Sequence, residues 1–189
     1  MVVLEAHMIL TPSQREYVMV RFQEEKPTAL WFSQHTYGQA FAYSAVEKSG
    51  TRPIAYSAAG THATYATGGK HDHTIPGLNL PNGPLVDNCD KGTLWDPLLN
   101  AFFFDFSRES KSFAAYDNAV PINWLHFTGR WGDQRYPDSD RRQGEIFGID
   151  ATALYTDGPT GPQDKQLDRV GVCPDQDGLF CFVRPVLTI

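Results

Sequence analysis

The stretch YVMVRFQEEKPTALWFS, from Tyr17 to Ser33, decides the fold of this chain. Tyr17 to Phe22 and Thr28 to Ser33 are rich in β-branched and aromatic residues, which favour strands. The residues Glu24 to Pro27 lie between these two runs and are typical of a turn. The pattern therefore predicts a β-hairpin, and we expect it to begin an antiparallel meander that occupies the first sixty residues.

Other strand-like runs follow, separated by turn signals, and no strongly amphipathic helix is visible. They are Ala40 to Ser44, Pro53 to Ala58, Asn123 to Thr128 and Leu179 to Val183. Residues 60–97 differ, because Gly, Pro, Asn and Asp dominate there, and we expect a long ordered loop of the kind that often carries function. The whole pattern predicts an all-β fold, an antiparallel β-sandwich with long loops and little helix.

The length and charge of the chain limit the number of domains and the kinds of partner that we expect. Its 189 residues fit a single domain, residues 1–189, because no linker or internal repeat divides them. Sixteen basic against 22 acidic residues leave a formal charge of -6 with no basic stripe, which argues against nucleic acid and against an anionic membrane surface as partners. No apolar run reaches the length of a membrane span, and Glu5 and His7 interrupt the apolar N-terminus. We therefore expect a soluble chain without a signal peptide, and its compartment stays unknown.

The three cysteines are Cys89, Cys173 and Cys181. They are too few and too far apart for a disulfide scaffold or for a zinc site with paired Cys-x-x-Cys spacing. A disulfide between Cys173 and Cys181 across a hairpin is one interpretation, but free or buried thiols are the favoured one.

A histidine-rich segment, GTHATYATGGKHDH, contains the candidate metal ligands His62, His71, Asp72 and His73. Imidazole and carboxylate groups are common ligands of zinc, iron and manganese. In an extended segment alternate residues face the same way, so His71 and His73 would point together. The spacing is compatible with a divalent cation as cofactor, although histidines that serve only as hydrogen-bonded struts fit the same segment.

A catalytic interpretation of the same region is also open. His35 and His62 are candidates for acid/base catalysis, because the unperturbed pKa of histidine lies near neutral pH. The aromatic side chains of Trp31, Tyr65 and Trp95 would then form the walls of a pocket for a small apolar molecule. Large aromatic residues occur more often in a core, and that interpretation of the tryptophans stands beside the first.

Several separated motifs resemble one known family. They are RPIAYSAAGTHATYATGGKHDHTIP (52–76), GTLWDPLLNAFFF (92–104), WLHFTGRWGD (124–133) and GPTGPQDKQLDR (158–169), followed by a Cys-Pro pair at Cys173. In this order they resemble the vacuolar protein sorting-associated protein 62 family, in a form that looks fungal. The resemblance implies an antiparallel β-sandwich and a link to delivery of proteins to the vacuole, without a defined biochemical activity.

The N-terminus departs from that family, so residues 1–16 are atypical. Members carry Gly-Asp-Trp-Glu-His just before the strand that reads VMVRF in this chain (18–22). This chain has Ser-Gln-Arg-Glu-Tyr at positions 13–17 instead, and only Glu16 matches. The family segment is similar to the His-Asp-Trp-Glu motif with which necrosis-inducing plant toxins hold a divalent cation. The resemblance therefore implies a shortened or divergent member in which some ancestral ligands are lost.

Two functional hypotheses follow. The first is a noncatalytic cation- or ligand-binding β-sandwich that acts in vacuolar sorting, with a protein partner. The second is a small-molecule enzyme of fungal secondary metabolism, of the cyclase, lyase or pericyclase type, which uses an aromatic pocket with histidines. Loss of N-terminal strands would expose a sheet edge, and a homodimer would cover it.

Overall fold

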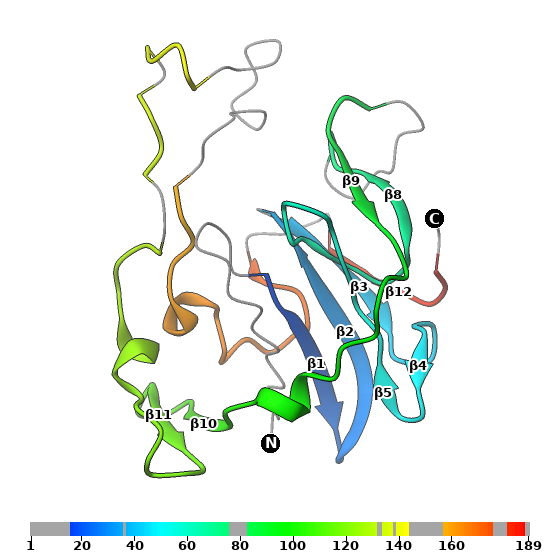
Figure 1. Ribbon diagram of the computed structural model, residues 1–189. Helices are drawn as coiled ribbons and strands as arrows, with labels where there is room; N and C mark the ends of the chain where they lie inside the picture. The colour runs from blue at the N-terminus through cyan, green and yellow to red at the C-terminus, as the bar shows by residue number, and fades with distance from the viewer. Residues whose placement is uncertain are drawn as a thin grey trace.

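The computed structural model describes residues 16–35, 37–75, 83–131, 134–137, 139–143, 157–175 and 181–187. Strands and irregular loops make up this part of the chain (Figure 1). The described helices are short 3-10 turns: η1 (Pro97–Asn100), η2 (Asn123–His126) and η4 (Pro162–Asp164). The prediction of an all-β fold with little helix is confirmed, whereas the sandwich arrangement is not confirmed.

The largest sheet has four strands in the order β1-β2-β3-β12. They are β1 (Val18–Gln23), β2 (Lys26–Gln34), β3 (Tyr37–Ala42) and β12 (Val183–Arg184). β2 pairs antiparallel with both β1 and β3, and β12 pairs parallel with β3. The hairpin expected from the opening stretch is therefore confirmed, with its turn at Glu24 and Glu25, which both have a positive φ.

Both faces of β2 are buried. Leu30 and Phe32 pack on one face with Val20 and Phe41. Trp31 packs on the other face in a second cluster of buried residues, which also contains Met19, Ala29, Ala40 and Val172. A strand that is covered on both sides reads as a continuous apolar run, which explains why β2 is so apolar in sequence.

Four two-stranded hairpins complete the described strands. They are β4 (Lys48–Ser49) with β5 (Arg52–Pro53), β6 (Tyr56–Ser57) with β7 (Thr64–Tyr65), β8 (Gly69–Asp72) with β9 (Val86–Cys89), and β10 (Phe104–Ser107) with β11 (Ser112–Ala115). The expectation of one long loop over residues 60–97 is wrong in this respect. The backbone of β8 and β9 is satisfied by ladder hydrogen bonds between segments that are distant in sequence, which a local pattern does not predict.

Two other strand predictions change. The strand expected at Asn123 to Thr128 is wrong, because Asn123–His126 form η2 and direct Leu125 into a cluster with Phe113 and Leu167. Tertiary packing there overrides the local preference of the aromatic residues for strands. The final strand is β12, at Val183–Arg184; positions 179 and 180 of the expected strand lie outside the described residues.

Cys173 and Cys181 form a disulfide, so the favoured interpretation of free thiols is wrong for this pair. Both cysteines pack against the cluster around Trp31, which brings the C-terminal loops onto the four-stranded sheet. Cys89 is a free, buried thiol, and burial raises its pKa to about 12. It is therefore an unreactive core residue.

Replacing both bridged cysteines, Cys173→Ser with Cys181→Ser, should lower the free energy of unfolding by roughly 2–3 kcal/mol, because the bridge closes a short loop and restricts the unfolded chain. Urea unfolding measures the change. Dithiothreitol should destabilise the wild-type protein by a similar amount and leave the double variant unaffected. Equal sensitivity of both proteins to the reductant would contradict the pairing.

Gly38 lies where β3 crosses the indole of Trp31. A Cβ atom at this position would overlap the Trp31 ring and the carbonyl oxygen of Phe32. We expect Gly38→Ala to lower the free energy of unfolding by about 1–3 kcal/mol through overpacking. Gly68→Ala is the matched control, because its Cβ would meet the Tyr56 ring at an ordinary 3.5 Å. Equal stability of the two variants would show that the Trp31 face of the sheet is loosely packed.

Candidate functional site

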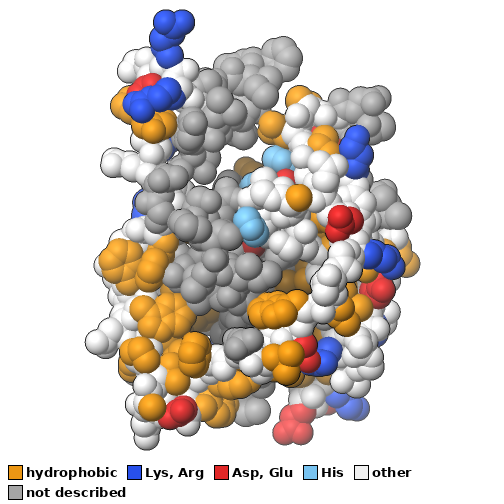
Figure 2. All heavy atoms as spheres, in the orientation of Figure 1, with side chains coloured by type: hydrophobic (Ala, Val, Ile, Leu, Met, Phe, Trp, Pro, Cys, Tyr) orange, Lys and Arg blue, Asp and Glu red, His pale blue; other side chains and the backbone are white. Residues whose placement is uncertain are grey.

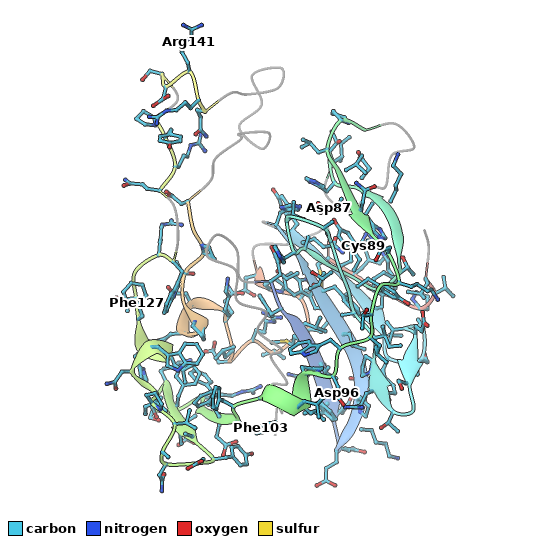
Figure 3. The ribbon with its side chains drawn as sticks, in the orientation of Figure 1. Asp87, Cys89, Asp96, Phe103, Phe127 and Arg141 are labelled. Carbon is cyan, nitrogen blue, oxygen red and sulfur yellow. A yellow bond between two sulfur atoms is a disulfide. The ribbon has the colours of Figure 1, made fainter. Side chains whose placement is uncertain are left out.

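The carboxylate of Asp87 on β9 is the centre of the candidate site, and its side chain is only 2% exposed. Three groups donate hydrogen bonds to it: His35 Nε2 at 2.8 Å, Thr61 Oγ1 at 2.7 Å and the Tyr65 hydroxyl at 2.6 Å. They come from the end of β2, the β6–β7 connection and β7. We call these four residues the Asp87 hub. Figure 3 labels Asp87, the second residue of β9, near the upper ends of the main sheet.

The strand periodicity of β9 turns Asp87 inward. Val86 and Asn88 are exposed, whereas Asp87 and Cys89 are buried, as expected where successive side chains of a strand face opposite sides. The β8–β9 register places Asp87 opposite His71. The hairpin therefore delivers an acidic side chain to the face that packs on the rest of the molecule.

The donors keep Asp87 ionised. Burial alone would raise its pKa, but the hydrogen bonds of His35, Tyr65 and Thr61 outweigh burial and hold the pKa well below its usual range. Tyr65 shows the reciprocal effect, because burial and its hydrogen bond to Asp87 raise the pKa of the phenol far above its usual value. The hub therefore combines a buried negative charge with neutral hydroxyl donors.

His35 is held in place from its backbone as well as from its ring. Its φ is 56°, in the left-handed region that non-glycine residues seldom adopt. The backbone N–H of His35 donates to Glu16 Oε1 at 3.2 Å, and the Ser33 hydroxyl donates to Glu16 Oε2. Burial opposes protonation of the ring, but the hydrogen bond and charge of Asp87, with the charge of Glu16, raise the pKa of His35.

His73 completes a group of three potential metal ligands. Its ring stacks on that of His35 at 4.2 Å between centroids, and its Nε2 lies 4.0 Å from Asp87 Oδ2. Burial and the neighbouring His35 lower the pKa of His73, so its imidazole is neutral at pH 7 and carries a lone pair. One ligand atom from each of His35, His73 and Asp87 lies within 4.8 Å of the others. We call these three residues the cation triad.

The structure brings together only part of the predicted metal set. His73 joins the triad, but the ring of His71 stacks on Tyr65 at 4.0 Å, and its Nε2 donates to Thr67 O at 2.8 Å. The carboxylate of Asp72 accepts hydrogen bonds from the backbone and the hydroxyl of Thr74. The backbone N–H of His62 donates to Ala58 O, and its φ is 64°.

The sequence alone does not single out Asp87 as a potential ligand, and it offers His35 only as a catalytic candidate. The alternation in VDNC, with a carboxylate at the position of a buried strand residue, is the signal that could have found Asp87. An acid at such a position requires several donors around it. Its pairing with His35 and His73 depends on tertiary structure, because these residues are 52 and 14 positions away in sequence.

The three aromatic residues predicted to line a pocket occupy different surroundings. Trp31 is 2% exposed in the cluster on the main sheet. Tyr65 is equally buried but belongs to another cluster, with Tyr56 and Cys89. Trp95 is 52% exposed. The apolar pocket and the catalytic roles of His35 and His62 therefore stay predictions.

Histidine and acidic side chains reach the surface together on the face shown in Figure 2. The exposed fractions agree, since the side chains of His35 and His73 are 22% and 27% exposed around the buried Asp87. A small ion can therefore approach the two imidazoles from solvent.

None of the described helices is both long and apolar enough to cross a membrane.

Two curated proteins of Saccharomyces cerevisiae are similar to this chain. One is "Putative vacuolar protein sorting-associated protein TDA6", 37% identical over 177 residues, which cover 84% of this chain and 37% of that protein. The other is vacuolar protein sorting-associated protein 62, 34% identical over 174 residues, which cover 84% of this chain and 36% of that protein. The chain thus spans little more than a third of the length of these relatives. No family model and no solved structure matches it.

Asp87→Ala should lower the free energy of unfolding by about 3 kcal/mol, because it leaves the donors of the hub without their acceptor in a buried site. Urea unfolding of the metal-free protein measures this change. Asp90→Ala is the matched control, because Asp90 is exposed three residues further along the chain. A loss of stability no larger than that of the control would contradict the structural role of the hub.

Proposed function

In the region that it shares with these two proteins, the chain is a member of the vacuolar protein sorting-associated protein 62 family, and we propose that it acts in vacuolar protein sorting as a noncatalytic, cation-binding β-protein. The link to vacuolar sorting rests on the names of the relatives. The cation rests on one observation, the convergence of His35, His73 and Asp87. The two parts of the proposal are therefore tested separately.

The chemistry of the triad suits a divalent transition-metal ion. Two imidazole nitrogens and one carboxylate oxygen are a common ligand set for zinc and for iron(II). Around a tetrahedral ion, with ligands at about 2.0–2.1 Å, neighbouring ligand atoms lie about 3.4 Å apart. The separation of 2.8 Å between His35 and Asp87 and that of 4.0 Å between His73 and Asp87 bracket this value. Small side-chain rotations would therefore close the site around the ion.

A cation at this point would cross-link three segments. His35 follows β2, His73 follows β8, and Asp87 lies on β9. The ion would replace the proton that joins His35 Nε2 to Asp87 and would hold the β8–β9 hairpin against the end of the main sheet. Three protein ligands leave a fourth position for water or for an oxygen atom of a bound molecule.

Protein purified without a histidine tag and stripped with EDTA should bind one equivalent of zinc, measured by elemental analysis after dialysis and by isothermal titration calorimetry. His73→Gln should weaken zinc binding at least tenfold, because it removes one of three ligands but none of the three hydrogen bonds to Asp87. Asp87→Asn should weaken it further, because it also removes the negative charge.

His62→Asn is the control for these variants. It removes a neighbouring histidine outside the triad, and asparagine tolerates the left-handed backbone found there. We expect the zinc affinity of this variant to equal that of the wild-type protein. Zinc binding that is lost in His62→Asn and retained in His73→Gln would refute the triad. Failure of the stripped wild-type protein to bind zinc or another transition metal would remove the cation from the proposal.

The sorting role is tested in the organism that carries the gene. Deletion of the gene should divert soluble vacuolar hydrolases into the medium, where their activity can be measured. The wild-type gene should restore retention. Normal retention after deletion would contradict a role in sorting and would leave the metal-binding result unaffected.

A further inference from the structure

Arg169 is a buried cation outside the cation triad. It lies in the irregular loop that follows η4, its exposed fraction is 7%, and its backbone N–H donates to Gln166 O at 3.1 Å. Arginine is seldom buried to this degree without a paired anion. The groups around its side chain therefore decide what it does.

One edge of the guanidinium is occupied. Nη1 donates to Lys165 O at 3.1 Å and to the Tyr17 hydroxyl at 3.5 Å. The guanidinium carbon also lies 5.5 Å from the centroid of the Trp31 ring, a cation–π distance. These contacts fix the plane of the side chain against β2 and against the residue that precedes β1.

The other edge is free. Nε and Nη2 of Arg169 are fully buried and have no hydrogen-bond partner among the described residues. These two N–H groups point in the same direction from one edge of a rigid plane, and we call them the Arg169 fork. Such a fork matches the two oxygens of a carboxylate, to which it can donate two parallel hydrogen bonds.

Two acidic residues near Arg169, Glu16 and Asp168, are engaged elsewhere. The Glu16 carboxylate accepts hydrogen bonds from the Ser33 hydroxyl and from the backbone of His35. Asp168, the residue before Arg169, forms an ion pair with Lys111. The Lys165 ammonium lies over the Tyr17 ring and adds a second positive charge to the neighbourhood.

We propose that the Arg169 fork binds the carboxylate group of a small molecule. The bound carboxylate would accept from Nε and Nη2, compensate the buried positive charge and lie beside Trp31 and Tyr17. A tetrahedral oxyanion such as phosphate offers the same paired oxygens, but the planar fork and the aromatic surroundings favour a planar organic acid. The proposal is independent of the cation triad, because no residue of the triad is hydrogen-bonded to the fork.

The Arg169 fork is buried, but it lies close to the protein surface, because both chain neighbours of Arg169 are exposed. Asp168 and Val170, on either side of Arg169, are exposed, and Val170 is 82% exposed. The segment between them belongs to no helix or strand. A ligand would therefore enter by a small displacement of this loop rather than by opening the main sheet.

The test uses acetate and phosphate as probes, with chloride as the reference at equal ionic strength and with EDTA present throughout. Thermal unfolding and isothermal titration calorimetry are measured on the wild-type protein, Arg169→Lys and Arg184→Lys. The lysine at 169 keeps the positive charge but loses the fork. Arg184 is the matched control, because it is a second buried arginine and lies over Phe41 and Phe182 instead.

We expect acetate to raise the melting temperature of the wild-type protein relative to chloride and to bind with a stoichiometry of one. The dissociation constant should rise at least tenfold in Arg169→Lys and should not change in Arg184→Lys. Equal acetate binding by wild type and Arg169→Lys would overturn the proposal, as would the absence of any effect of acetate beyond that of chloride. Binding of phosphate without acetate would overturn the assignment to a carboxylate.

Arg169→Met guards against a variant that fails to fold. Methionine fills part of the same volume without buried donors, so this variant should fold and be at least as stable as the wild-type protein in chloride. It should also lose the stabilisation by acetate. Stabilisation by acetate that persists in Arg169→Met would overturn the proposal.

Discussion

A buried, ionised carboxylate at Asp87 is the constraint on which this end of the molecule depends. A charge that is 2% exposed is tolerated only where several donors surround it, and here a histidine, a threonine and a tyrosine supply them. The histidine comes from the end of β2, and the threonine and the tyrosine come from the β6–β7 hairpin. The hub therefore fixes the β8–β9 hairpin, the β6–β7 hairpin and the end of the main sheet relative to one another.

The same arrangement explains why the geometry favours the binding of a cation. The backbone of His35 is in the left-handed region and is hydrogen-bonded to Glu16, and it directs the His35 imidazole at Asp87. The imidazole of His73 stacks on the His35 ring and therefore lies beside it. A hydrogen-bonded strut needs only one of these histidines. The second is a neutral imidazole whose Nε2 lies 4.0 Å from the carboxylate, outside hydrogen-bond distance, and a metal ion would give it a bonding role.

The sequence was informative where structure is local and misleading where it is not. The hairpin of β1 and β2 could be predicted because two runs of strand-forming residues flank a run of turn residues within one short stretch. The β8–β9 hairpin could not, because its strands are short and are paired across a long connection. For the same reason the sequence predicts His73 as a candidate ligand, whereas Asp87 and His35 come together with it only through tertiary pairing. The disulfide between Cys173 and Cys181 was considered and not favoured, since spacing alone does not distinguish a bridge from two thiols.

The central claim is that His35, His73 and Asp87 form one metal centre. A crystal structure of tag-free protein soaked in zinc, with anomalous differences recorded on both sides of the zinc absorption edge, tests it most directly. The account predicts a single strong peak within about 2.0–2.2 Å of His35 Nε2, His73 Nε2 and an Asp87 carboxylate oxygen. A peak on His62 or His71 instead, or an unaltered hydrogen bond from His35 to Asp87 with no peak beside it, would contradict the account.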